Sequence, residues 1–204
     1  MRYEIATLTI RLGKAAAVVS AIDAELKSGT AKGRLLGCWA SEIGTLNQVI
    51  LLRGFEGEEA LREERERILT SGNPFGCGED IAKLDFDSYA PFPFLPLVEP
   101  GKHGSVYEIR TYMLNHGGVP ATIAAWEAAI PARTELSPLV IAMYALDGPP
   151  RFTHIWPFES LNHRAAVRAD SVAKGVWPPK GGPQWLTGEM YSTIALPTAI
   201  SPLA

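Results

Sequence analysis

Residues 3–13, YEIATLTIRLG, return as YEIRTYMLNHG at residues 107–117, an offset of 104 residues. After each segment, apolar side chains recur at intervals of four, three and four positions, which is the spacing of one face of an α-helix. These side chains are Ala15, Val19, Ile22 and Leu26 in the first case and Val119, Ile123, Trp126 and Ile130 in the second. Phe55-Glu56 also returns, as Phe158-Glu159. The chain therefore contains two copies of one unit of about 100 residues.

Each copy is predicted to have the element order β-α-β-β-α-β, the split βαβ or ferredoxin-like pattern. In the first copy, strands are expected near residues 3–10, 34–43, 46–55 and 82–90, with helices near 14–27 and 57–70. In the second, a strand is expected over 106–114, and a helix runs from its N-cap at Ser160 to Gly175. A four-stranded sheet with both helices on one side leaves its other face uncovered. We therefore predict an α+β fold in which two four-stranded antiparallel sheets pack together as a barrel.

The division of the chain follows from the repeat. The copies are assigned to residues 1–98 and 106–204, and residues 99–105, which contain proline, glycine and serine, are assigned to a linker. Hydrophobic residues make up 47% of the chain and charged residues 20%, a balance that provides enough apolar side chain for a buried core.

Charge and hydropathy narrow the range of partners. The net charge is −3 and lysine and arginine form no cluster, so nucleic acid is not an expected partner. The longest apolar run, residues 139–146, is far shorter than the roughly 20 residues that a bilayer requires, and no signal peptide is indicated. We therefore expect a cytoplasmic protein without a membrane partner. Cys38 and Cys77 form no metal-binding motif, so reduced thiols are expected, with no metal and no cofactor.

One polar hairpin stands out in the first copy. The run GCWASEIGTLNQVILLRGFEG, residues 37–57, resembles the signature of the NIPSNAP family: an aromatic residue after glycine, then Glu-x-Gly-x-Leu-Asn, a hydrophobic strand and an acidic helix start. Both YEI openings and PFESLNHRAAVRA, residues 157–169, also resemble that family. The resemblance implies the dimeric α+β barrel superfamily and no agreed reaction. Relatives in that superfamily include cofactor-free monooxygenases, lactone isomerases and haem proteins that use the barrel interior.

The second copy departs from this motif. It reads ALDGPPRF over residues 145–152, so Ala145 stands in the place of Glu42 and the polar residues around Asn47 are lost. Asp147-Gly148 is a tight-turn pair, so the hairpin itself is expected to persist. A function that depends on Glu42 and Asn47 can therefore exist only once in the chain.

Strand alternation assigns side chains to faces. In the strand at 46–55, Asn47 and Arg53 share one side, which we place toward the barrel interior, because the opposite side is aliphatic and suits packing against helices. The corresponding side in the second copy carries His154 and Trp156.

The strand at 106–114 completes the predicted cavity. Glu108, Arg110 and Tyr112 share one side of it, which we also place inward, since the alternative would bury their charges beneath helices. The predicted cavity between the two sheets thus combines charged and aromatic side chains. These are Arg53, Glu108, Arg110, Tyr112, His154 and Trp156.

Two functional hypotheses follow. In the first, the cavity binds or transforms a small organic molecule; His154 would be the catalytic general acid or base, and Arg53 or Arg110 would stabilise a developing oxyanion. Glu42 and Asn47 are further binding candidates. In the second, the barrel is a non-enzymatic scaffold whose outer helices or free sheet edges recruit other proteins. The same edges suggest a homodimer or higher oligomer. Each candidate also has a purely structural interpretation, as an ion pair of the sheet or as aromatic core.

Overall fold

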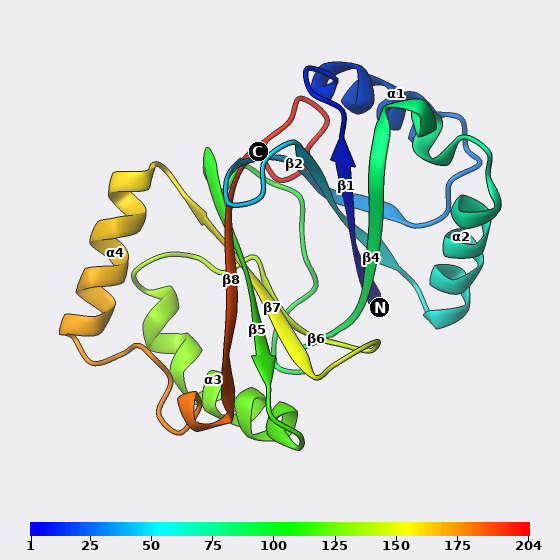
Figure 1. Cartoon of the computed structure of the whole chain (residues 1–204). Coiled ribbons are helices and arrows are strands. Elements are labelled where there is room, and N and C mark those ends of the chain that lie inside the picture. Colours follow the sequence, from blue (N-terminus) through cyan, green and yellow to red (C-terminus); the bar gives the residue numbers. More distant parts are fainter.

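The computed structural model describes residues 1–204 and contains the predicted elements in the predicted order (Figure 1). The first half consists of β1 (Arg2–Ile10), α1 (Ala15–Lys27), β2 (Arg34–Ile43), β3 (Gln48–Phe55), α2 (Glu58–Thr70) and β4 (Ile81–Pro91). The second half consists of β5 (Val106–Leu114), α3 (Gly118–Thr134), β6 (Ile141–Ala145), β7 (Arg151–Phe158), α4 (Leu161–Ala173) and β8 (Leu186–Pro197). Short 3₁₀ turns precede β4 and β8, at Pro74–Gly76, Gly78–Asp80 and Pro183–Trp185.

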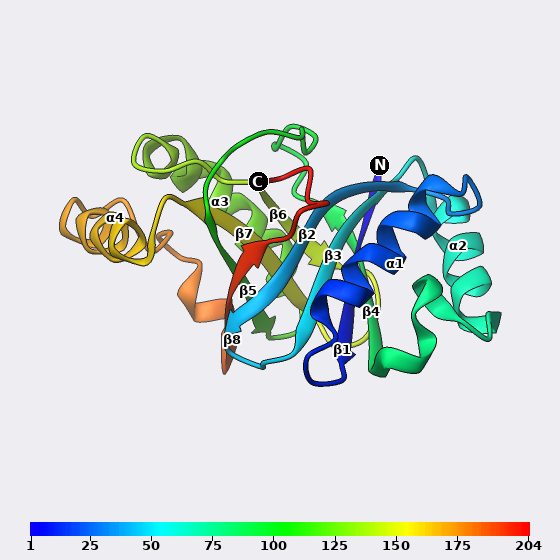
Figure 2. The same ribbon diagram turned by 90° about the horizontal axis from the view of Figure 1, so that it is seen from above.

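The eight strands form one closed barrel in the order β1-β3-β2-β8-β5-β7-β6-β4. Every neighbouring pair is antiparallel, and each half contributes four consecutive strands. The two halves join where β2 pairs with β8 and where β4 pairs with β6. Helices α1 and α2 cover one side of the barrel, and α3 and α4 cover the opposite side (Figures 1 and 2). The α+β barrel of two ferredoxin-like sheets is confirmed, and no strand keeps a wholly unpaired edge.

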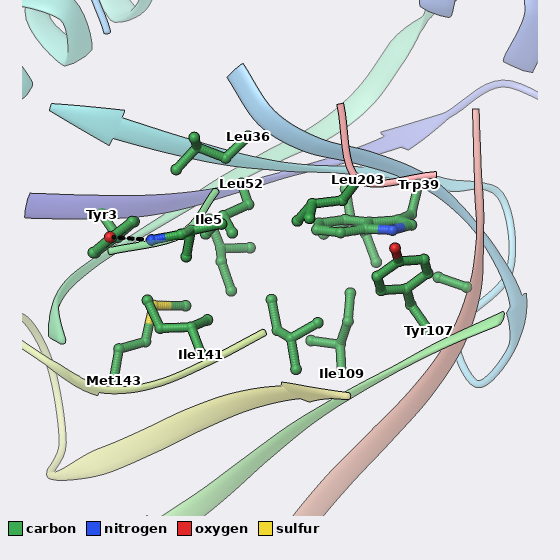
Figure 3. Close-up of a cluster of buried hydrophobic side chains, with 14 of the residues drawn as sticks. Tyr3, Ile5, Leu36, Trp39, Leu52, Tyr107, Ile109, Ile141, Met143 and Leu203 are labelled. Atoms are coloured by element: carbon green, nitrogen blue, oxygen red, sulfur yellow. Dashed lines mark hydrogen bonds between the residues drawn. The ribbon is translucent and has the colours of Figure 1, made fainter. Parts of the chain in front are cut away.

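The interior of the barrel is filled with apolar side chains from both sheets (Figure 3). Tyr3, Ile5, Ile50 and Leu52 come from the first half. The ring centroids of Trp39 and Tyr107 lie 5.3 Å apart across the β2–β8 seam. A closed eight-stranded sheet encloses little more space than its own inward side chains occupy. The interior of this barrel is therefore a packed core.

Two segments outside the strands close one end of this core. Val98 lies in the segment between β4 and β5 and Leu203 in the C-terminal tail, and both belong to the interior cluster. The Val98 N–H donates to the Tyr3 hydroxyl at 3.2 Å, which Figure 3 shows as a dashed line. Gly101 holds the two segments together, since its N–H donates to the carbonyl of Pro202 at 3.0 Å. Of the segment predicted as a linker, residues 99–105, Gly101 is thus bonded to the C-terminal tail, while most of the other residues are exposed.

The predicted direction of the strand faces was wrong. Ile50 and Leu52 point into the barrel, whereas Val49 and Leu51 pack with helix α1 in a separate cluster outside it. The side chain of Arg53 follows the second set and meets Glu64 of helix α2. Glu108, Arg110, Tyr112, His154 and Trp156 likewise lie on the helix side of the second sheet, where residues of α3 and α4 surround them. The predicted charged cavity between the sheets does not form.

The physical reason is that the helices supply partners for the buried charges. A buried carboxylate is tolerated when arginines pair with it. In the second half, Arg164 and Arg168 of α4 both reach Glu108. The middle of the barrel is lined by apolar side chains and a few hydroxyl groups, such as those of Thr111 and Thr153, whose oxygens lie 2.7 Å apart. The inward-facing ion pair of Arg151 with Asp87 lies at the start of β7, where Asp147 of the neighbouring turn also pairs with Arg151. Charges are therefore less costly beneath the helices than inside the barrel.

Gly37 has a specific packing role in this core. A Cβ atom at this position would overlap the indole ring of Trp39, which lies along the same strand. We expect Gly37→Ala to lower the free energy of unfolding by about 1–3 kcal/mol, because the buried ring has to move. Urea denaturation measures the change. Gly188→Ala is the matched control, since nothing lies within 4 Å of a Cβ there. Equal stability of the two variants would contradict this role for Gly37.

Candidate functional site

A cleft of about 540 Å³ lies between the second sheet and its two helices. We call it the α3–α4 cleft. Its walls come from β5, β7, α3, α4 and the residues just after α4. The lining side chains with functional groups are Glu108, Tyr112, Arg133, His154, Trp156, Ser171 and Trp177, with Arg168 at its edge on α4. A smaller hollow of about 340 Å³ adjoins it, and Tyr112 and Trp177 line both.

Glu108 is the centre of the charged side of the cleft. The carboxylate is fully buried, and it accepts hydrogen bonds at 2.5 Å from both Arg110 of β5 and Arg164 of α4. Arg168 lies 3.6 Å from the second carboxylate oxygen, which has no hydrogen-bond partner. Burial by itself would raise the pKa of Glu108, but the hydrogen bond from Arg164 and the charge of Arg110 outweigh it and lower the pKa to about 2. Glu108 is therefore ionised at neutral pH.

His154 lies at the base of the cleft and is only 2% exposed. Its Nδ1 accepts a hydrogen bond from the Trp156 indole N–H at 2.7 Å. An indole nitrogen can only donate, so Nδ1 carries no proton and the neutral ring must carry its proton on Nε2. Burial, assisted by the charge of Arg110, lowers the pKa of His154 to about 3. His154 thus presents a neutral Nε2–H donor, and no acceptor within the chain receives it.

Arg133 is the cation of the cleft without an ion pair. The side chain comes from the last turn of α3 and is 3% exposed. Its guanidinium carbon lies 4.3 Å from the ring centre of Trp156 and 5.9 Å from that of Trp177, which is cation–π geometry. Its buried Nη1 has no hydrogen-bond partner. Burial, with the charge of Arg168 adding to it, lowers the pKa of Arg133 to about 10, so it remains charged at neutral pH.

Aromatic rings form the apolar walls. Trp126 of α3, which lines the adjoining hollow, lies 4.8 Å from both His154 and Trp177, measured between ring centroids. The rings of Tyr112 and His154 pack edge to face, with their centroids 5.1 Å apart. Rings in this arrangement present flat apolar surface next to the polar groups already described. The cleft therefore offers stacking surface together with a small number of oriented donors.

The corresponding region of the first half is occupied by a closed ion-pair network. Arg53 is 1% exposed; it donates to Glu4, and also to Glu64 at 3.0 Å. Arg65 reaches Glu4 at 2.9 Å, and Arg67 reaches Glu64 at 2.9 Å. Both carboxylates and the whole Arg53 guanidinium find partners within the chain. The predicted binding residue Arg53 is therefore part of a satisfied structural network, separate from the α3–α4 cleft.

Glu42 and Asn47 also lie away from the cleft. Both are exposed, at the end of β2 and in the turn before β3. Asn47 was predicted as part of the strand, but it is a turn residue with φ of 55°. Asparagine adopts this left-handed conformation more readily than most residues. The structure therefore accounts for Asn47 by backbone geometry, and it brings five of the eight predicted site residues together: Glu108, Arg110, Tyr112, His154 and Trp156.

Arg133, Arg168 and Trp177 were not predicted from the sequence. For Arg133 a signal existed, because it continues the apolar face of α3 through Trp126 and Ile130 at intervals of four and three. A charged side chain on the buried face of a helix needs either a partner that compensates its charge or a functional role. Trp177 lies in an irregular segment, and no periodicity marks it.

Fold and site together define a class: a duplicated α+β barrel with an open cleft between its second sheet and the helices that cover it. The model of the NIPSNAP family matches residues 3–96 and 107–202 of the chain, and the chain therefore belongs to the NIPSNAP family. A protein NipSnap homolog of Dictyostelium discoideum is 26% identical over 147 residues, which cover 70% of this chain and 65% of that protein. The chain thus corresponds to less than two thirds of the length of that relative.

Two solved structures share the barrel. The crystal structure of a "putative monooxygenase" from Lactobacillus acidophilus NCFM superposes with a TM-score of 0.69 at 10% identity, covering 96% of this chain and 93% of that one. The structure of an anthrone oxidase-like protein superposes with a TM-score of 0.68 at 12% identity, covering 98% and 93%. Identity this low establishes the shared fold alone. None of the helices in this structure is both long and apolar enough to span a bilayer.

Proposed function

We propose that the protein binds a small organic molecule with a flat, largely apolar body in the α3–α4 cleft. One observation carries the proposal: buried polar atoms on three different elements, Glu108 Oε2, Arg133 Nη1 and His154 Nε2, have no partner in the chain and belong to side chains lining one cleft. A buried polar group without a partner costs free energy. A ligand that supplies the missing partners removes that cost, and the aromatic walls fit its body.

The duplication provides an internal comparison. Glu4 corresponds to Glu108 at the repeat offset, yet both of its oxygens are bound by arginines of its own half. At the position of Trp156 the first half has Arg53, which fills the space between sheet and helix with charge. The polar groups of the first copy are therefore occupied by contacts within the chain. The other keeps polar groups that are free to meet a ligand, which supports a function in the second copy alone.

The protonation state of His154 indicates which role this residue can have in the site. A general acid or base works best with a pKa near the working pH. The pKa of about 3 and the hydrogen bond from Trp156 favour a fixed donor over a group that exchanges protons. We infer that His154 positions the ligand through Nε2–H. The earlier hypothesis of proton transfer by this residue has no such support.

Blocking the cleft tests the proposal. Ala169 and Ala166 are both exposed alanines of α4, and only Ala169 lines the cleft. A panel of small aromatic and quinone-like compounds is titrated while tryptophan fluorescence is recorded, since Trp156 and Trp177 report on the cleft directly. We expect Ala169→Phe to weaken binding at least about tenfold, because a phenyl ring occupies the ligand volume. Ala166→Phe should bind as the wild type does. Absence of saturable binding, or unchanged binding by Ala169→Phe, would overturn the proposal.

A further inference from the structure

The ion pairs of the two halves differ in their balance of charge. Beneath the first sheet, the three arginines that pair with Glu4 and Glu64 also reach two more carboxylates: Arg67 lies 2.7 Å from Glu25, and Arg65 lies 3.4 Å from Asp147. These three arginines thus meet four carboxylates, of which Asp147, in the turn between β6 and β7, also pairs with Arg151. Beneath the second sheet, Glu108 is the single carboxylate among four arginines. These are Arg110, Arg133, Arg164 and Arg168.

The surplus positive charge is concentrated on one buried group. Arg110 and Arg164 both donate to Glu108, so their charges are partly neutralised. Arg133 has no carboxylate within salt-bridge distance, and its Nη1 is both buried and without an acceptor. The faces of Trp156 and Trp177 stabilise its charge, but they leave the in-plane N–H groups unused.

Two other side chains of the cleft have an unpartnered atom. Glu108 Oε2 lies 3.6 Å from Arg168 Nη1, an ion-pair distance, whereas His154 at the base of the cleft is a second donor. His154 offers Nε2–H and no free acceptor, since its Nδ1 already receives the indole N–H of Trp156. Two donors from different elements, one of them cationic, therefore line a cleft with aromatic walls. The ligand group that complements them is a planar acceptor with negative charge. The planar fork of an arginine matches a carboxylate in this way.

We infer that the molecule bound in the α3–α4 cleft is an organic carboxylate, whose carboxylate pairs with Arg133 and accepts from His154 while its apolar body lies against Trp156 and Trp177. This inference rests on the proposed function and adds the charge of the ligand to it. Glu108 fits the same arrangement, because it holds Arg110 and Arg164 and leaves Arg133 for the ligand.

A matched pair of probes separates charge from shape. The acid 2-naphthoate and its neutral amide, 2-naphthamide, have the same flat body and nearly the same size. Both are titrated into the full chain at neutral pH, with tryptophan fluorescence and calorimetry as readouts. We expect wild-type protein to bind the acid at least about tenfold more tightly than the amide. Added salt should reduce this preference, since it screens the charge of the site.

Substitutions of single cationic residues identify the one that pairs with the ligand carboxylate. Arg133→Met keeps most of the side-chain length, and we expect it to weaken binding of the acid at least about tenfold while leaving the amide unchanged. Lys174→Met is the control, because it removes one exposed cation of the same region that pairs only with Asp170. Circular dichroism confirms folding. Should Arg133→Met fail to fold, Arg168→Met at the edge of the cleft replaces it, with an expected loss of about threefold for the acid alone.

The outcomes separate the two proposals. Equal affinity for acid and amide, or unchanged binding of the acid by the folded arginine variant, overturns the inference and leaves the proposed function standing. Failure of both probes to bind overturns the inference, and it overturns the proposed function as well when no compound of the aromatic and quinone-like panel binds. Tighter binding of the acid that depends on Arg133 and not on Lys174 supports both.

Discussion

Arg53→Met is expected to lower the free energy of unfolding by about 3–5 kcal/mol. Arg53 is 1% exposed and bridges two fully buried carboxylates, Glu4 and Glu64. Methionine fills a similar volume, so the loss reflects the missing charge rather than a cavity. Each carboxylate keeps one arginine, since Arg65 pairs with Glu4 and Arg67 with Glu64, which places the effect toward the lower end of the range.

Urea denaturation at neutral pH measures the loss. Arg62→Met serves as the control, because Arg62 is an exposed arginine of the same half whose ion pairs with Glu59 and Glu66 face solvent. Pairs of this kind contribute about 0–1 kcal/mol. A loss below about 1 kcal/mol for Arg53→Met would show that the network is dispensable, and the structural role assigned to it would be wrong.

Glu108→Gln has the second large expected effect, and this one depends on pH. The pKa of Glu108 is about 2 in the folded protein and about 4.5 without that environment. Because the folded pKa is lower, the stabilisation is fully present above pH 4.5 and is lost as the pH falls toward 2. Each unit of pKa difference corresponds to 1.36 kcal/mol, so Glu108→Gln should cost about 3 kcal/mol at neutral pH.

The measurement is the stability difference between wild type and variant as a function of pH. We expect that difference to shrink progressively below pH 4.5 and to approach zero near pH 2. Glu189→Gln, an exposed carboxylate of β8, should differ from wild type by less than about 0.5 kcal/mol throughout. A difference for Glu108→Gln that does not change with pH would mean that its charge is not the source of the stability.

The same variant connects stability to binding. Glutamine removes the carboxylate that holds Arg110 and Arg164, which increases the net positive charge facing the cleft. A less stable protein that binds carboxylates more tightly than the wild type is thus the combination to expect from Glu108→Gln. A network that served only the fold would show the first change without the second.

Much of the architecture could be predicted from the sequence because it depends on local periodicity. The strands at 34–43 and 106–114 coincide with β2 and β5, and Ser160 does cap α4, accepting the N–H of His163. The repeat implied two sheets with one uncovered face each, and closure of the barrel follows from that symmetry. The turn before β3 was predicted two residues too short, because Asn47 adopts a left-handed conformation that a strand pattern does not reveal.

The candidate site could be predicted from the sequence only in part. Tyr112, His154 and Trp156 were predicted to lie in one cavity, and they do line one cleft. The predicted position of the cavity was wrong, because the observed cleft lies beneath the helices and not between the sheets. Arg133 and Trp177, which form much of that cleft, come from a helix end and an irregular segment that no strand alternation could place beside β7.

The sequence by itself determined the two-fold repeat, the order of its elements and the pairing of side chains on common faces. Only the tertiary structure decided which face points inward. All of β7 and nearly all of β3 are buried on both sides, so alternation along these strands contains no contrast between core and solvent. The choice depends on which side can offer partners to charge. Arginines on α2 and α4, far away in sequence, provide those partners beneath the helices, whereas the middle of the barrel presents a cluster of apolar side chains.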